Sequence, residues 1–393
     1  MSKEAWIVSA ARTPVGSFNG ALSKLPASEL GAIAIKGALE RSQFKGEDVD
    51  EVIMGCVIPA AQGQAPARQA ALKSGLPSKV ACMTVNKVCG SGLKSVGLAT
   101  QAIRCADARL VIAGGMENMS WAPHALIGSR MGIRMGPGNF VDTMVHDGLW
   151  DSFNNCHMGN FADKTAELKN FTREELDEFT VQSYKKALAA QEAGKFKKEI
   201  VPVEIKGRKG DVTIVDTDEE PGRVKFDKIP KLRPAFNKDG VITAANASSL
   251  NDGAAAVAIV DSEFAKERGI KPMVRVVAQA TASLDPNWFT LAPIDSIKKV
   301  LNIAGMKKDD IDIWEINEAF SVVSLVTQQT LDIDPDKIDI WGGAVAIGHP
   351  IGASGARVLT TLLYVMEDRD ARYGCASLCI GGGEAMAMIV ERI

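Results

Sequence analysis

The most constraining feature of this 393-residue chain is a pattern of residues that occurs twice in the same order. The paired segments, separated by 262 or 263 positions, are Lys36–Leu39 with Lys298–Leu301, Asp48–Asp50 with Asp310–Asp312, Gly90–Gly92 with Ala353–Gly355, and Ala108–Arg109 with Ala371–Arg372. Several matches in one order at nearly one spacing indicate an internal duplication. We therefore expect two similar halves, each built from one alternating α/β unit.

Hydrophobic periodicity gives the elements of the first half. Short apolar runs predict strands at Trp6–Ala10, Val49–Val57, Ala81–Val85 and Leu110–Gly115, and we expect the third of these to be buried. Apolar residues at helical spacing predict a helix over Ser28–Arg41, with Ser28 as its N-cap.

The segment between the halves has a different character. It is rich in methionine, glycine and charge, and its one clear helix, Thr172–Ala193, opens with a capping box at Thr172–Glu175. A segment this long and irregular is usually functional. We expect a loop domain at 121–250 that binds ligand and makes oligomer contacts. The N-terminal half would then comprise 1–120 and 251–272, and the C-terminal half 273–393.

Composition excludes several classes of partner. The net charge of −3 implies neither a nucleic acid nor an anionic membrane surface. Seven cysteines without a C-x-x-C pair, together with only four histidines, argue against a zinc site and suit a reducing compartment. The N-terminus resembles neither a signal nor a transit peptide, and no apolar run is long enough to span a membrane. We expect a cytoplasmic protein.

Cys89 lies at a glycine-rich turn between a predicted strand and a predicted helix. Gly90 and Gly92 allow a tight bend and close approach of a ligand to the backbone. A cysteine at a helix start lies in the positive end of the helix dipole, which lowers its pKa and favours the thiolate. Free N–H groups there can also hold an oxyanion. The turn alone fits a buried structural cysteine equally well.

Three more glycine-rich turns carry a polar group at the end of a predicted strand. They contain Asn317, His349 and Cys379. Taken singly, Asn317 fits a helix cap, His349 a loop histidine and Cys379 a small core residue. Two of these turns have counterparts at the repeat offset, so we expect the reactive groups to converge where the repeats meet. Together with Cys89 they favour a catalytic site.

The chain resembles the thiolase family over essentially its whole length. The family's motifs occur here as Asn86–Gly92, Gly114–Ser120, Asn246–Gly253, Asn317–Phe320, Gly348–Pro350 and Cys379–Gly383. The resemblance implies a thiolase-like fold of two duplicated, five-stranded α/β halves packed as α-β-α-β-α layers, plus a loop domain. It implies a homotetramer, a dimer of dimers. It also implies an acyltransferase that reversibly condenses two acetyl-CoA molecules to acetoacetyl-CoA and CoA.

The same resemblance implies roles for individual residues. Cys89 would be the nucleophile that takes the acetyl group, and His349 would accept its proton. Cys379 would move the proton at the substrate α-carbon, as a thiol with a pKa near neutrality. Asn317 would hold a water that, with His349, stabilises the enolate oxygen. The N–H groups of Cys89 and Gly381 would form a second oxyanion hole.

Coenzyme A thioesters are the implied substrates, with no permanently bound cofactor. Positions that match the family's pantetheine tunnel are Leu149, His157, Met158, Ala247, Ser248 and Phe320. Arg223 and Lys228 match an adenine-nucleotide contact and suit phosphates, although a solvated charged turn has the same composition.

Two further resemblances concern the acyl pocket and a cation. His157-Met158-Gly159 resembles the short-chain branch, in which a methionine narrows the acyl pocket. Phe289-Thr290 is less usual in that branch and leaves open whether branched acyl groups are accepted as substrates. A potassium site of some short-chain relatives is matched by Tyr184, Ala244, Ala245, Ala247 and Val345. Tyr184 by itself fits an ordinary helix position, and no other metal is expected.

Three other functions compete with this one. A degradative thiolase for longer 3-ketoacyl-CoA would have the same catalytic residues. A decarboxylating ketosynthase shares the fold and a cysteine, but Cys379 argues against it. A non-enzymatic CoA or lipid carrier is opposed by the intact set of Cys89, His349 and Cys379.

Overall fold

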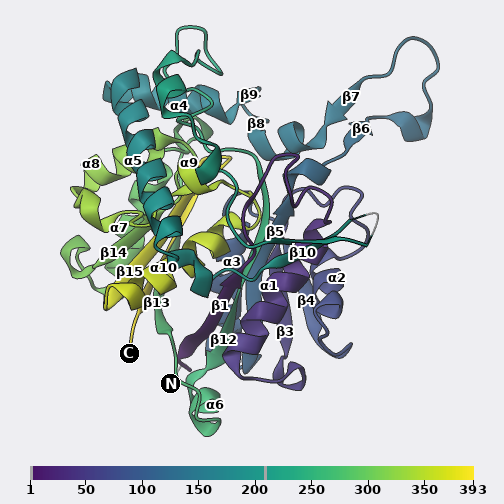
Figure 1. Ribbon diagram of the computed structural model, residues 1–393, viewed down its shortest axis with the longest axis vertical. Helices are drawn as coiled ribbons and strands as arrows, with labels where there is room; N and C mark the ends of the chain where they lie inside the picture. Colours follow the sequence, from purple (N-terminus) through teal and green to yellow (C-terminus); the bar gives the residue numbers. More distant parts are fainter. Residues whose placement is uncertain (1–2, 208–209) are drawn as a thin grey trace.

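A ten-stranded mixed sheet runs through the molecule, for which a computed structural model describes residues 3–207 and 210–393 (Figure 1). Its strand order is β14-β15-β16-β13-β1-β12-β5-β3-β4, with β2 beside β12. These strands are β1 (Ala5–Arg12), β2 (Gly16–Ser17), β3 (Glu51–Gly55), β4 (Ala81–Val85), β5 (Leu110–Asn118), β12 (Asn251–Asp261), β13 (Val274–Ser283), β14 (Ile313–Ile316), β15 (Tyr373–Ile380) and β16 (Glu384–Glu391). Only two residue pairs join β1 to β13, so the sheet has two parts that meet at this edge.

The two parts repeat one arrangement, as the sequence duplication predicts. In the N-terminal part β5 is parallel to β3 and antiparallel to β12. In the C-terminal part β15 is likewise parallel to β14 and antiparallel to β16. Helix α3 (Ser91–Arg104) precedes β5 just as helix α10 (Ser354–Asp368) precedes β15.

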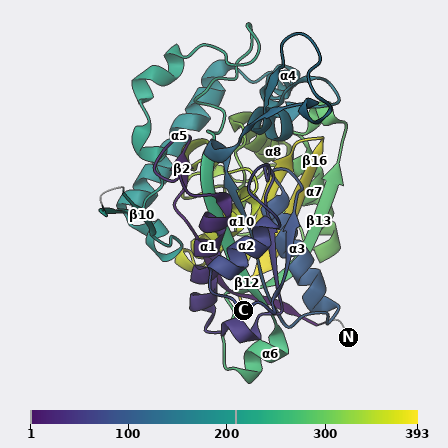
Figure 2. The same cartoon turned by 90° about the vertical axis from the view of Figure 1, so that its right-hand side faces the viewer.

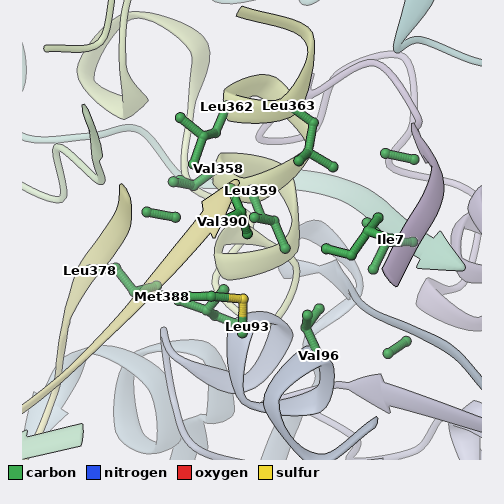
Figure 3. Packing of buried hydrophobic residues seen from close by; sticks show 14 of the residues in the cluster. Ile7, Leu93, Val96, Val358, Leu359, Leu362, Leu363, Leu378, Met388 and Val390 are labelled. Carbon is green, nitrogen blue, oxygen red and sulfur yellow. The ribbon is translucent and has the colours of Figure 1, made fainter. Parts of the chain in front are cut away.

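Helices α3 and α10 form the central layer of the fold. Figure 3 shows Leu93 of α3 and Leu359 of α10 in one apolar cluster with Ile7 of the N-terminal sheet part and Met388 of the C-terminal part. The outer layers are formed by α1 (Ala27–Ser42) and α2 (Pro66–Lys73) on one side and by α7 (Ala292–Ala304) and α8 (Ser321–Leu331) on the other. The expected α-β-α-β-α layering is therefore present.

The segment between the halves supplies helices at one end of the molecule and a projecting hairpin. Helices α4 (Met158–Lys169) and α5 (Arg173–Glu192) lie at the end opposite both termini in both views (Figures 1 and 2). Thr172 and Glu175 form the predicted capping box of α5. Strands β6 (His124–Leu126) and β7 (Phe140–Asp142) form a hairpin that extends away from the body (Figure 1).

The remaining elements are short. They are β8 (Trp150–Asp151), β9 (Cys156–His157), β10 (Val203–Lys206), β11 (Val212–Val215), α6 (Ser262–Glu267) and α9 (Ala344–Ile347). No helix among the described residues is long and apolar enough to cross a membrane.

Two local expectations about the first half are wrong. Helix α1 begins at Ala27 with Pro26 as its N-cap, so Ser28 lies inside the helix, where its hydroxyl contacts Gln69. Strand β4 is half exposed rather than buried, because it is the last strand of the sheet and pairs only with β3.

The C-terminal half has four sheet strands where the resemblance implies five. At the place equivalent to β4, a single bridge joins Trp314 to Ile338. The next residue, Asp339, has φ +44°. Its carboxylate accepts a hydrogen bond from the Ile316 N–H at 2.9 Å, a bond that a backbone carbonyl would accept in a regular sheet. The chain turns away there, which ends the pairing after one step.

Candidate active site

The glycine-rich turns of both halves meet at a cavity of about 430 Å³, a size typical of small-molecule sites. Of the residues predicted from the sequence, those that line it are Cys89, Leu149, His157, Met158, Ala244, Ala247, Ser248, Phe289, Phe320, His349 and Gly381. The N-terminal half, the C-terminal half and the segment between them thus all contribute walls.

Cys89 lies at the turn between β4 and α3, directly before the helix N-cap Gly90. A side chain at Gly90 would collide with Ile380, so only glycine allows this approach of the two halves. The N–H groups of Gly381 and of Cys89 itself lie close enough to the Cys89 sulfur to favour its thiolate. These are the two donors expected for an oxyanion hole.

The expectation of a lowered Cys89 pKa is wrong for the unliganded protein. Burial raises the pKa of the thiol to about 11, although the N–H groups of Gly381 and Cys89 act in the opposite direction. The helix N-terminus would lower the pKa of Cys89 through local structure. The exclusion of water from the thiol by both halves raises this pKa, and it is the larger effect. The resting nucleophile is therefore a neutral thiol.

His349 is held as a neutral base. Its Nδ1 lies 2.5 Å from the Ser354 hydroxyl, which itself donates to the Pro350 carbonyl oxygen at 2.9 Å. Because that hydroxyl proton is already used, Nδ1 is the donor and Nε2 carries the lone pair. Nε2 is buried without a protein partner among the described residues. Burial, assisted by Arg357, lowers the pKa of His349 to about 3.

The protonation states of Cys89 and His349 predict how acetyl transfer depends on pH. A neutral thiol with a pKa of about 11 and a neutral imidazole with a pKa of about 3 both keep their form across the range between. If His349 removes the proton as the sulfur attacks, we expect acetylation of Cys89 by acetyl-CoA to change by less than about threefold from pH 5.5 to 8.5. Rapid-quench mass spectrometry measures this rate. A rise of about tenfold per pH unit would instead show attack by the small fraction of free thiolate.

Asn251 positions the His349 backbone from the other half. Its Oδ1 accepts a hydrogen bond from the His349 N–H at 2.8 Å, and its Nδ2 donates to the Gly16 carbonyl at 3.0 Å. Gly348 has φ +112°, and a side chain there would collide with Asn251. The sequence places Asn251 in a family motif, but nothing local indicates that it contacts His349.

Glu117 connects the same loop to the N-terminal half, a role that no sequence pattern indicates. Its carboxylate accepts hydrogen bonds from the N–H groups of Val57, Ile58 and Gly352. Burial raises its pKa to about 7 despite these bonds. Because the folded protein binds this proton more tightly than the unfolded chain, ionisation of Glu117 reduces stability as the pH rises from about 4.5 to about 7.

Cys379 and Asn317 lie beneath the cavity surface rather than in its lining. Cys379 is fully buried beside Met158, Phe289 and Phe320, and it is close enough to Cys89 for the two thiols to affect each other. Burial raises the pKa of Cys379 well above its ordinary value, so the expectation of a near-neutral pKa is wrong for the unliganded protein. Both side-chain atoms of Asn317 are buried and have no protein partner among the described residues, which suits an amide that holds a water.

Sulfur and aromatic groups contribute much of the cavity lining. Phe236, which no sequence signal indicated, stacks on His157 with 4.7 Å between ring centroids. Phe289 contacts Phe320 and Phe161 edge-on. Four further lining residues belong to family motifs but had no individual role predicted: Met119, Ser249, Leu250 and Ala319. Lining residues without a sequence signal are Met144, Val145, Gly148, Ala235 and Ile351.

The structure does not bring every predicted binding residue to this cavity. Arg223 and Lys228 are exposed on the short helical turns Pro221–Arg223 and Phe226–Lys231, outside the cavity lining. Of the predicted potassium ligands, Ala244 and Ala247 line the cavity, whereas Tyr184 and Val345 lie on helices α5 and α9, which pack together.

Comparison with known proteins identifies the family. Residues 5–263 match the family model for the thiolase N-terminal domain, and residues 270–392 match that for the thiolase C-terminal domain. Three similar proteins are each named acetyl-CoA acetyltransferase. The one from Cupriavidus necator is 54% identical over 387 residues, 98% of each chain. That from Allochromatium vinosum is 52% identical over 394 residues, 100% of each chain, and that from Pseudomonas aeruginosa 50% over 387 residues, 98% of each chain. The chain belongs to the thiolase family.

Proposed function

We propose that this protein is an acetyl-CoA C-acetyltransferase, which reversibly condenses two acetyl-CoA molecules to acetoacetyl-CoA and CoA. The observation that carries the proposal is the environment of Cys89: the N–H groups of Gly381 and Cys89 lie close to its sulfur, in a cavity that Cys89 shares with the unprotonated Nε2 of His349. Near-full-length similarity to acetyl-CoA acetyltransferases supports it.

The first half-reaction follows from this arrangement. The Cys89 sulfur attacks the thioester carbonyl of acetyl-CoA as its proton passes to His349 Nε2. The N–H groups of Cys89 and Gly381 stabilise the tetrahedral oxyanion. When the intermediate collapses, the CoA sulfur leaves and takes the proton from His349, which leaves an acetyl group on Cys89.

The second half-reaction forms the carbon–carbon bond. Cys379, which lies close to Cys89, acts in its thiolate form and takes a proton from the α-carbon of a second acetyl-CoA. Asn317, through a water, and His349 stabilise the enolate oxygen. The enolate carbon then attacks the acetyl carbonyl, and the Cys89 sulfur leaves as a thiolate and receives the proton that Cys379 took.

A chain-length series of thiolysis rates tests the substrate. Met158 and Phe289 line the cavity and belong to the same buried cluster as Cys379, which favours a short acyl group. We expect kcat/KM for acetoacetyl-CoA to exceed that for 3-ketohexanoyl-CoA by at least about tenfold. A matched Met158→Ala variant should reduce this ratio. Equal or higher rates with long chains would instead indicate a degradative thiolase.

Assembly into a tetramer is a further part of the proposal, and the β6–β7 hairpin supports it. Met131 and Met135 on this hairpin are 88% and 94% exposed, and Ile127 and Phe140 are also exposed. Exposed apolar groups on a projecting loop suit a subunit contact. We expect light scattering to give a tetramer at micromolar concentration, and Met131→Ser with Met135→Ser to weaken it. Ile303→Ser, at an exposed apolar site on α7, is the control and should leave the mass unchanged. A stable wild-type monomer would contradict the prediction.

The remaining proposals concern compartment and ligands. The seven cysteines are all free in the described structure, which suits the cytoplasm. Leu149, His157, Ala247 and Ser248 would hold the pantetheine arm. Arg223 and Lys228 would contact the nucleotide phosphates, and potassium would bind near Tyr184.

A further inference from the structure

An ion pair connects the two turns that build the oxyanion hole. Lys87, two residues before Cys89, places its Nζ 2.5 Å from Oε2 of Glu384, three residues after Gly381. The other carboxylate oxygen accepts a hydrogen bond from the Ser283 hydroxyl at 3.2 Å. Lys87 is in the N-terminal half and Glu384 is in the C-terminal half, so the contact spans the junction where the site forms.

On the N-terminal side the pair is attached to a strained turn. Val88, between Lys87 and Cys89, has φ +45°, a region in which a β-branched residue is a genuine outlier. Such strain persists only where surrounding contacts hold it. Here the Val88 N–H donates to Asn86 Oδ1, and the Ser91 hydroxyl accepts from the Lys87 N–H and donates to the Val88 carbonyl. The turn is therefore rigid up to the Lys87 side chain.

On the C-terminal side the pair follows a hairpin turn, which the pairing of Ile380 with Glu384 closes. Gly381 supplies an N–H close to the Cys89 sulfur, and the next two residues, Gly382 and Gly383, have φ +87° and +90°. Glycines permit many backbone conformations. Glu384 is the first side chain after them, and it is anchored to Ser283 and Lys87.

We propose that Lys87 and Glu384 are positioning residues for acyl transfer: their ion pair fixes the Gly381 N–H at the Cys89 sulfur before substrate binds. The inference rests on the proposed function. A displacement of about 1 Å at a reacting group can reduce a rate by about 10²-fold, whereas a partly exposed ion pair contributes little to stability. The pair thus affects catalysis more than folding.

The test compares the pair with an ion pair of similar geometry elsewhere. Lys195 and Asp368 also lie 2.5 Å apart with similar exposure, but far from the cavity lining. Variants Lys87→Met, Glu384→Gln, their double mutant, Lys87→Arg and the control Lys195→Met are assayed for acetoacetyl-CoA thiolysis and thermal unfolding.

We expect Lys87→Met and Glu384→Gln each to lower kcat by about ten- to hundredfold, with KM for CoA within about twofold and an unfolding temperature close to wild type. The double mutant should be no worse than either single one, because both remove the same contact. Lys87→Arg should retain most activity and Lys195→Met all of it. The proposal is overturned if kcat stays within twofold, if the single effects multiply, or if Lys195→Met behaves like Lys87→Met.

A second readout separates this inference from the proposed function. The Gly381 N–H lowers the pKa of Cys89, so loss of its position should slow alkylation of Cys89 by iodoacetamide several-fold, with the site located by mass spectrometry. This readout needs no acyl substrate. Absent thiolysis in the wild type would refute the proposed function. An unchanged alkylation rate in Lys87→Met would refute the positioning role.

Discussion

Replacement of Cys89 by serine is expected to lower turnover of acetoacetyl-CoA by about 10⁴-fold or more while the fold stays intact. The cavity accepts a hydroxyl in place of the thiol because the two side chains have similar size. An alcohol, however, gives up its proton far less readily than a thiol with a pKa of about 11, and His349, with a pKa of about 3, is too weak a base to compensate.

Mass spectrometry supplies the direct measurement. Wild-type protein incubated with acetyl-CoA should carry one acetyl group on Cys89, and Cys89→Ser should carry none there. Replacement of the exposed Cys105 by serine is the control and should leave acetylation of Cys89 unchanged. Acetylation located on any other residue of the wild type would remove Cys89 from its assigned role.

Cys379→Ala is expected to separate the two half-reactions. The variant should still become acetylated on Cys89, because that step uses His349 and the two N–H donors. It should lose both condensation and thiolysis, since both require proton exchange at the α-carbon. The small change in side chain should leave the surrounding cluster of Met158 and Phe289 in place.

Deuterium exchange distinguishes a proton-transfer role from a second nucleophile. With Cys379→Ala, deuterium from solvent should no longer enter the methyl group of bound acetyl-CoA. His349→Ala should fail earlier, at acetylation itself. If the methyl protons of acetyl-CoA bound to Cys379→Ala exchanged at the wild-type rate, another group would have to be the base. His349 would be the first residue to examine.

Features that depend on local spacing could be predicted from the sequence. The duplication, the strand before Cys89, the capping box of α5 and the glycine-rich turns around His349 and Cys379 all follow from patterns within short windows. The convergence of these turns followed from the repeat itself, because equivalent elements of two similar halves meet at equivalent places.

Features that depend on distant partners could not be predicted. Asn251 contacts His349 across 98 positions, and Glu117 contacts Gly352 across 235. The pKa of Cys89 was predicted in the wrong direction because the helix start is visible in the sequence, whereas its burial by the C-terminal half is not. The exposed position of β4 likewise depends on the order of strands in the sheet.

The bonds from Asn251 and Glu117 to the His349 loop have a consequence for how substrate enters. Both come from the N-terminal half, yet they hold the loop that carries the base of the C-terminal half. Separation of the two halves to admit substrate would break these hydrogen bonds and displace the loop that carries His349. We therefore expect substrate and product to enter and leave through the wall supplied by the intervening segment, around Leu149, His157 and Phe236, without separation of the two halves.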